Sequence, residues 1–221
     1  DDMPARLVNS QIDEWFSKVL GMNVRLVKMP LSTERKVDPK YAVNGESVSF
    51  ADGMPYLLIG QKSLEDLNKK LEEPVPMNRF RPNIVFSGGE AFIEDSWRRI
   101  QIGELDLQVV KPCARCVMIT VDQNTGIKAA EPLKTLASYR REGKKVLFGQ
   151  NVVALSSGVI KVGDELEFFY GLYKYFDHFR INIWINPMAK ISYVSCASEL
   201  LHHSDGSLAH LVGSSVKSRR V

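Results

Sequence analysis

The chain has few cysteines, no strong excess of either charge and no long apolar segment. Three cysteines in 221 residues is a low and odd number, which argues against a secreted disulfide framework and favours a reducing compartment. Lysine and arginine number 29 against 26 acidic residues, for a formal net charge of +3. This near balance argues against a nucleic-acid-binding protein, because such proteins usually carry a basic stripe or a strong basic excess.

Targeting signals are also lacking. No run of about 18 apolar residues occurs, so the sequence predicts no membrane span. The first residues are acidic and polar rather than basic and apolar, so we expect no signal peptide and a cytoplasmic protein. No initiator methionine leads the chain, and we expect it to start in the middle of a longer polypeptide. No internal repeat occurs, and the length suits one substantial core.

The N-terminal part carries helix signals. Ser10 is predicted to cap a helix that Gly21 ends, and the apolar residues between them recur at helical spacing. We expect residues 1–22 to be a linker and helix from a region that precedes the chain. Residues 30–52 are polar and turn-rich, and predict a long loop with a possible function of its own.

Short strands with a few helices fill the middle of the chain. The hairpin signal Gly103-Glu104 joins two of the strands, and helices are predicted to open at Ser63 and near Pro132. Together these signals predict an α+β fold built on a barrel of short mixed strands. The strands are predicted at residues 56–59, 83–86, 97–102, 105–110, 117–122, 151–155 and 165–169, with a further candidate at 181–185.

The run Lys111-Pro112-Cys113-Ala114-Arg115-Cys116 holds two of the three cysteines. Basic neighbours favour the thiolate, which is the form of cysteine that binds metals or attacks electrophiles. A zinc site would need further ligands from Cys196, His178, His202, His203 or His210, all more than sixty residues away. A thioredoxin-like dithiol would need a helix after the pair, and two buried structural cysteines are a third possibility.

Six motifs follow one another along the chain: residues 78–85, 94–97, 110–122, 132–136, 147–151 and 160–164. Their order and content resemble the MOSC domain, which is named for the C-terminus of molybdenum cofactor sulfurase. Within that family they are most similar to the mitochondrial amidoxime-reducing component and its bacterial relatives. The resemblance implies a MOSC-type β-barrel with a few flanking helices at residues 23–169, followed by an unassigned tail at 170–221.

The resemblance also implies a site, position by position. Cys116 matches the family's molybdenum ligand, while Ala114 and Arg115 match residues that help to hold the pterin cofactor. Arg81 and Asn83 match the arginine and asparagine of the family's F-R-P-N run. The chemistry agrees, because thiolate suits a soft metal and guanidinium suits phosphate and pterin acceptors.

Three departures from the family pattern stand out. Gly53 and Met54 occupy the cofactor-binding positions where the family usually has a Ser or Thr pair, so side-chain hydrogen bonds are lost there, although Gly53 still offers a backbone N–H. Ala114 replaces a residue that is often serine. We also expect the family's N-terminal barrel to be missing, which would leave the chain with the metal ligand and only part of the pocket.

The resemblance implies a molybdenum-cofactor (molybdopterin) enzyme that reduces small N-hydroxylated substrates, with Cys116 as the catalytic metal ligand. Two electrons and two protons release the oxygen of the N–O bond as water. The electrons would come from a redox protein, namely a reductase, a ferredoxin-like protein or a b-type cytochrome. Pyridoxal phosphate binding is implied only for the superfamily, and full-length eukaryotic relatives are associated with the mitochondrial outer membrane.

A second hypothesis is a binding module without redox turnover. Cys116 would then carry sulfur as a persulfide and deliver it to a cofactor or metabolite. Molybdenum content separates the two hypotheses, because an enzyme retains stoichiometric metal and a carrier does not. Asp122 is a weaker candidate for a polar role, since the start of a turn explains it better.

Overall fold

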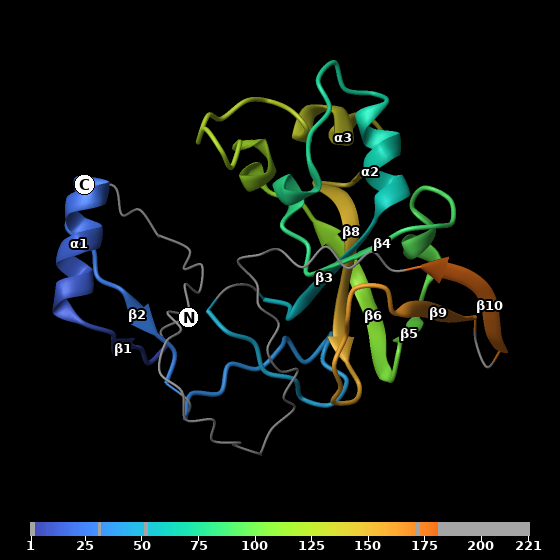
Figure 1. Ribbon diagram of the computed structural model, residues 1–221, viewed down its shortest axis with the longest axis horizontal. Coiled ribbons are helices and arrows are strands. Elements are labelled where there is room, and N and C mark those ends of the chain that lie inside the picture. The colour runs from blue at the N-terminus through green and yellow to red at the C-terminus, as the bar shows by residue number, and fades with distance from the viewer. Residues whose placement is uncertain (1–2, 31, 51–52, 171–172, 181–221) are drawn as a thin grey trace.

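A curved mixed sheet is the central element of the part of the chain that the structure describes (Figure 1). The computed structural model describes residues 3–30, 32–50, 53–170 and 173–180. The strands form a nearly closed barrel in the order β10-β9-β5-β6-β8-β3-β4, with β7 paired to β8. The strand bounds are β3 Tyr56–Gly60, β4 Ile84–Phe86, β5 Arg99–Ile102, β6 Leu105–Ala114, β7 Arg141–Glu142, β8 Lys145–Ala154, β9 Glu165–Tyr170 and β10 Tyr173–Arg180.

The long strands β6 and β8 form the centre of the sheet and carry the cysteine run at one end. They run antiparallel, with Leu107 opposite Ala154 and Ala114 opposite Leu147. Register irregularities lie between Val109 and Lys111 and again before Ala114. Such irregularities bend a strand and re-aim its side chains, so the chain leaves the sheet just before Cys116.

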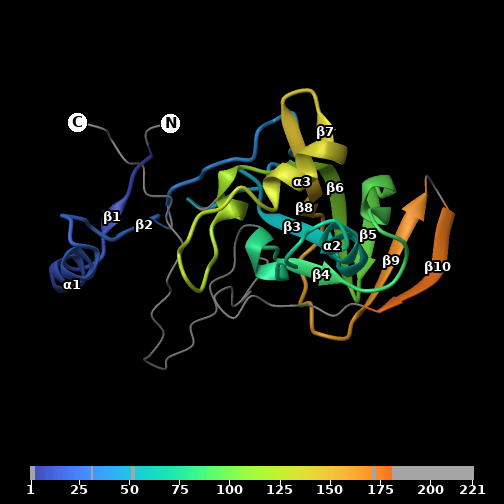
Figure 2. The ribbon, with the colours of Figure 1, turned by 90° about the horizontal axis from the view of Figure 1, so that it is seen from above.

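Among the described residues, three α-helices and three 3-10 helices accompany the sheet, and the helices α2 and α3 pack on it together (Figure 2). Leu64 and Leu67 from α2, with Leu136 from α3, bury against Ile59 and Phe148 of the sheet. A second set of buried residues, including the stacked pair Trp97 and Phe168, fills the barrel interior. The helix bounds are α1 Ser10–Leu20, α2 Gln61–Asn68, α3 Leu133–Tyr139, η1 Met77–Phe80, η2 Ile93–Ser96 and η3 Val117–Thr120.

The N-terminal helix matches its predicted end but not its predicted cap. Gly21 ends α1 in the left-handed conformation, at φ 63°, as predicted. The capping side chain is Asn9 rather than Ser10, and it accepts the Gln11 N–H at 2.7 Å. With the short pair β1 (Arg6–Leu7) and β2 (Val27–Lys28), α1 stands apart from the barrel in both ribbon views. No helix in the described ranges is long and apolar enough to cross a membrane.

The strand predicted at residues 117–122 is wrong. Residues Val117–Thr120 form the 3-10 helix η3, which starts directly after Cys116. Residues 117–120 have no neighbouring strand to pair with, because pairing between β6 and β8 ends at Ala114. The Thr120 hydroxyl donates to the Val117 carbonyl at 2.8 Å and closes the turn instead.

The sheet continues beyond the C-terminal end of the predicted domain, and the long loop within that domain packs on the barrel. Strand β10 pairs antiparallel with β9, so the sheet continues beyond residue 169. The candidate strand at 181–185 lies outside the described residues. The loop predicted at 30–52 contains an isolated bridge between Lys36 and Ser47, and Val37 and Val48 are buried against the barrel.

The buried carboxyl of Glu94, a residue of η2, contacts the start of α2. It accepts the Gly60 N–H at 3.1 Å and the Ser63 hydroxyl at 2.7 Å. Burial raises the pKa of Glu94, against the opposing effect of these hydrogen bonds. The tertiary contact therefore caps α2, whose N-cap residue, Gly60, has no side chain to do so.

We expect this carboxyl to make stability fall as the pH rises from about 4.5. Because the folded-state pKa of Glu94 lies above its unfolded value, the folded state binds more protons between the two, and deprotonation favours unfolding there. The unfolding free energy of Glu94→Gln, measured by urea denaturation, should depend less on pH than that of the wild type as the pH rises above about 4.5. Glu104→Gln at the exposed hairpin turn is the matched control, and equal pH profiles for both variants would contradict the assignment.

Candidate functional site

Cys116 sits at the junction of β6 and η3 with an exposed side chain. Its position is fixed from both sides. On one side the Arg115 N–H donates to the Val146 carbonyl at 2.7 Å, which ties the end of β6 to β8. On the other side, Ile119 and Thr120 of η3 are buried. A held backbone thus presents an exposed thiol, which is the arrangement that a cysteine needs to bind a metal from outside the fold.

Arg115 lies beside Cys116 in sequence, but its guanidinium contacts the other cysteine. One terminal nitrogen donates to the Cys113 Sγ at 3.0 Å and the other to the Phe80 carbonyl at 2.8 Å. Its Nε is buried without a hydrogen-bond partner. Cys113 is half-buried and packs against the core beneath the helices. Arg115 therefore joins the cysteine run to η1, the turn that precedes Arg81.

Arg81 ends η1 in a left-handed conformation, with φ 53° and ψ 46°. Such a conformation costs a non-glycine residue about 1 kcal/mol or more. The side chain is exposed, and no carboxylate within the described ranges forms an ion pair with it. A strained, exposed and unpaired arginine next to the cysteine run is typical of a residue held ready for an anionic ligand.

Asn83 and Ala114 lie in the same segments as Arg81 and Cys116, and the Asn83 side chain is already used in a bond within the sheet. The Asn83 Oδ1 accepts the Leu57 N–H at 2.9 Å, and the Asn83 N–H donates to the Leu57 carbonyl at 2.9 Å. These two bonds fasten the start of β4 to β3. Ala114 is exposed at the last position of β6. Both residues lie within the segments that carry Arg81 and Cys116.

Gly53 and Met54 lie elsewhere along the sheet. Met54 is buried with Val37, Val48 and Val153. Tyr56, two residues later, pairs with Val152, whereas Ala114 pairs with Leu147 nearer the other end of β8. The register therefore separates this segment along β8 from the cysteine run, and the Met54 side chain serves the core.

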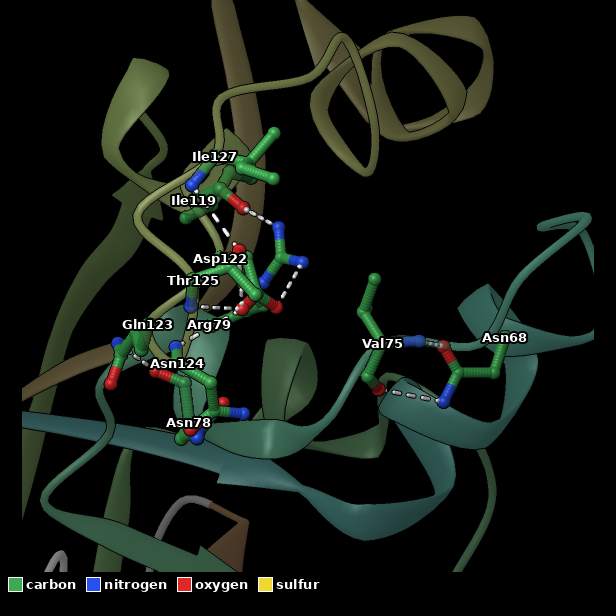
Figure 3. A network of polar contacts seen from close by, with 10 residues as sticks. All are labelled: Asn68, Val75, Asn78, Arg79, Ile119, Asp122, Gln123, Asn124, Thr125 and Ile127. Carbon is green, nitrogen blue, oxygen red and sulfur yellow. Dashed lines mark hydrogen bonds and ion pairs between the residues drawn. The ribbon is translucent and has the colours of Figure 1, made fainter.

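The polar network between η1 and the segment that follows Cys116 in the chain was not predicted as a whole (Figure 3). Arg79 of η1 donates to the Asp122 Oδ2 at 2.9 Å and to the Ile119 carbonyl at 3.4 Å. The backbone N–H of Thr125, with help from its hydroxyl, from the Asn124 N–H and from Arg79, lowers the pKa of Asp122. Asp122 therefore starts a turn, as the sequence favoured. Its contact with Arg79, 43 positions away, has no signature in the local sequence.

Within the described part of the chain, no three His, Cys, Asp or Glu side chains lie together in a way that could hold a metal ion. Cys196, His202, His203 and His210 lie outside the described residues. Cys116 can thus supply one thiolate to a metal whose other ligands come with a cofactor. An exposed thiol with an unpaired cation nearby fits an anionic cofactor that brings its own metal.

Comparison with known proteins identifies relatives for most of the barrel. A family profile described as the MOSC domain matches residues 45–167. The human mitochondrial amidoxime-reducing component 1 is 44% identical over 128 residues, covering 54% of this chain and 38% of the human protein. The rat mitochondrial amidoxime reducing component 2 is 40% identical over 179 residues, covering 74% of this chain and 53% of the rat protein.

A plant protein is also similar. The molybdenum cofactor sulfurase of Arabidopsis thaliana is 37% identical over 158 residues, covering 63% of this chain and 19% of that protein. The chain thus spans about half the length, or less, of the relatives that it matches. Both groups of relatives carry names that concern molybdenum cofactor or amidoxime reduction.

Proposed function

Because the chain belongs to the MOSC-domain family, we propose that it binds molybdenum cofactor through Cys116 and takes part in the reduction of N-hydroxylated compounds. The observation that carries the proposal is the exposed Cys116 thiol next to a turn bearing the exposed, strained and unpaired Arg81. The relatives named for amidoxime reduction support the reaction class. Their names also favour mitochondrial association over the cytoplasmic location expected from sequence.

The residues present suit the cofactor. Arg81 offers a guanidinium that is exposed and forms no ion pair with the described carboxylates, and it can bind a phosphate or a pterin oxygen. Ala114, two residues before the thiol, is exposed as well. Arg115 contributes differently. Two of its three nitrogens already bind Cys113 and Phe80, so it supports the site chiefly by holding the cysteine run against η1. When bound, the cofactor supplies the two-electron reduction of the N–O bond.

The exposure of Cys116 determines what can reach the site. A small substrate and water approach from solvent, and water can supply the two protons that leave with the oxygen. The reduction also consumes two electrons, which a donor has to deliver to the same exposed site. We propose an electron-transfer partner that docks over this open face.

The test of the proposal is molybdenum content together with turnover. The chain is expressed in a host that makes the cofactor, and molybdenum per chain and reduction of an amidoxime by a chemical electron donor are measured. Metal bound through Cys116 together with amidoxime reduction supports the enzyme. A Cys116 persulfide found by mass spectrometry, without metal, favours sulfur transfer, which the plant relative makes the second candidate.

We expect Arg81→Gly to separate binding from stability. Glycine adopts the left-handed conformation without strain, so the variant should melt no lower than the wild type. Loss of the guanidinium should weaken cofactor retention about tenfold or more, as expected for one charge-assisted hydrogen bond. Thermal melting of the cofactor-free protein and molybdenum per chain give the two readouts, and Arg98→Gly, an exposed arginine between η2 and β5, is the control. A lower melting temperature with full metal content would show that Arg81 is structural.

A further inference from the structure

The loop that bears Cys116 is fastened to the turn that bears Arg81 by an ion pair. Arg79 lies two residues before Arg81, and Asp122 lies six residues after Cys116. Their side chains meet at 2.9 Å and are mostly buried, with 12% and 26% of their surfaces exposed. An ion pair that is shielded to this degree is less weakened by solvent than a surface pair.

Asp122 uses both carboxylate oxygens, and for different purposes. Its Oδ1 accepts the N–H groups of Asn124 and Thr125 at 3.0 and 2.9 Å, which shapes the local turn. Its Oδ2 accepts from Arg79. A residue that served the turn alone would need only the first oxygen, so the second contact connects two segments that are distant in sequence.

Further contacts strengthen the same junction (Figure 3). Arg79 also donates to the Ile119 carbonyl, and the Gln123 side-chain amide donates to the Asn78 carbonyl. The loop is in turn closed on itself by a bridge between Val121 and Lys128. The whole segment after Cys116 therefore rests on η1 as one piece.

We propose that Arg79 and Asp122 are positioning residues that fix Cys116 relative to Arg81. The inference rests on the proposed function, which assigns metal binding to Cys116 and anion binding to Arg81. Neither residue of the pair needs to touch cofactor or substrate. Their part is to keep a thiol and a guanidinium from different segments at a fixed separation, which a shared ligand requires.

Alkylation of Cys116 in the cofactor-free 221-residue chain tests this arrangement directly. Iodoacetate is an anion, and iodoacetamide is a neutral reagent with the same reacting carbon. The guanidinium of Arg81 should accelerate the anion relative to the neutral reagent by about twofold to threefold at low salt, the size of effect that one unit charge has in water within a Debye length. Peptide mapping by mass spectrometry reads Cys116 separately from Cys113, and Arg81→Gln gives the ratio without the guanidinium.

The ion pair between Arg79 and Asp122 is then removed by a substitution of either residue. Asp122→Asn keeps an acceptor for the turn but loses the ion pair, and Arg79→Gln loses the pair together with a positive charge. Positioning predicts that the rate ratio falls in both variants towards that of Arg81→Gln, and that Arg79→Lys restores it in part. A direct effect of charge predicts opposite changes, since one variant removes an anion and the other a cation. General destabilisation would raise both rates and leave their ratio unchanged.

A matched ion pair supplies the control. Arg99 and Asp106 also meet at 2.9 Å, on the β5–β6 hairpin, and Asp106→Asn should leave the ratio at the wild-type value. Three results would overturn the inference. The rate ratio of iodoacetate to iodoacetamide could shift in opposite directions in Asp122→Asn and Arg79→Gln, or stay unchanged in both. The wild-type ratio could also equal that of Arg81→Gln.

Molybdenum content gives a second readout that separates this inference from the proposed function. After expression in a cofactor-producing host, Asp122→Asn and Arg79→Gln should hold several-fold less molybdenum per chain than Asp106→Asn. If the wild type holds no molybdenum, the proposed function fails, while the alkylation ratios still decide whether Arg79 and Asp122 position Cys116. If the wild type and all variants hold equal metal, the inference fails and the proposed function stands.

Discussion

Cys116→Ala is expected to lose essentially all bound molybdenum and all amidoxime reduction, while Cys113→Ala keeps a substantial part of both. The thiol of Cys116 is exposed at the start of η3 and free of protein hydrogen bonds among the described residues. Cys113 is half-buried, packs on the core and already accepts from Arg115. Only the first is placed to bind a metal that arrives from solvent.

The Cys113 variant should nevertheless show a small defect. Removing its sulfur leaves one Arg115 nitrogen without its acceptor, at a cost of about 1 kcal/mol, which corresponds to about fivefold weaker retention if all of it falls on the bound state. Cys113→Ser, which restores an acceptor, should recover much of that loss. Molybdenum per chain and initial rates are measured for all three variants. Equal loss of metal in Cys116→Ala and Cys113→Ala would indicate a dithiol site instead.

Local chemistry was enough to predict much of the barrel. The Gly103-Glu104 turn joins β5 and β6 as expected, and Gly21 ends the first helix. Such features depend on a few adjacent residues, because glycine alone adopts the required backbone conformation at little cost. The family match, which covers residues 45–167, agrees with the fold class that these short elements indicated.

The helix η3 shows where local chemistry fails. Residues 117–122 have the composition of a buried strand, and an apolar run of this length does not distinguish a strand from a helical turn. The choice between a strand and a helical turn is decided by the end of pairing between β6 and β8, at Ala114 and Leu147. That end follows the register irregularities in β6. One of them falls at Pro112, which has no N–H for the ladder and so marks the site in part, whereas the one between Val109 and Lys111 has no such residue.

The resemblance predicted which residues form the site, but not the contacts that hold those residues in place. Spacing within the cysteine run does not reveal that Arg115 would contact Cys113 and Phe80. Nor does it reveal that Arg79 would reach Asp122. Pairs of this kind are set by tertiary packing, so a single sequence shows their members only as an ordinary basic residue and an ordinary turn residue.

Close approach of β3 to β8 underlies the largest stability effect that we expect, in Gly149→Ala. Gly149 lies in β8 with φ +79°. A Cβ placed there would lie 2.9 Å from the Leu58 carbonyl oxygen and 2.7 Å from the Ile59 Cγ1. The oxygen belongs to the backbone of β3 and cannot move aside without disturbing the sheet, whereas the positive φ alone already disfavours alanine.

These two penalties should together cost about 2–4 kcal/mol of the free energy of unfolding. Gly143→Ala, at φ +57° with no atom within 4 Å of the added Cβ, carries only the backbone penalty of about 1–2 kcal/mol. Urea unfolding gives the free energy of unfolding of both variants, which is compared where the dependence on urea concentration is the same. The difference between the two losses is the cost of the close approach. Because β3 also anchors Asn83 through Leu57, Gly149→Ala should loosen the start of β4 and, with it, the turn that holds Arg81. Equal losses in the two glycine variants would show that β3 can withdraw from β8 without cost.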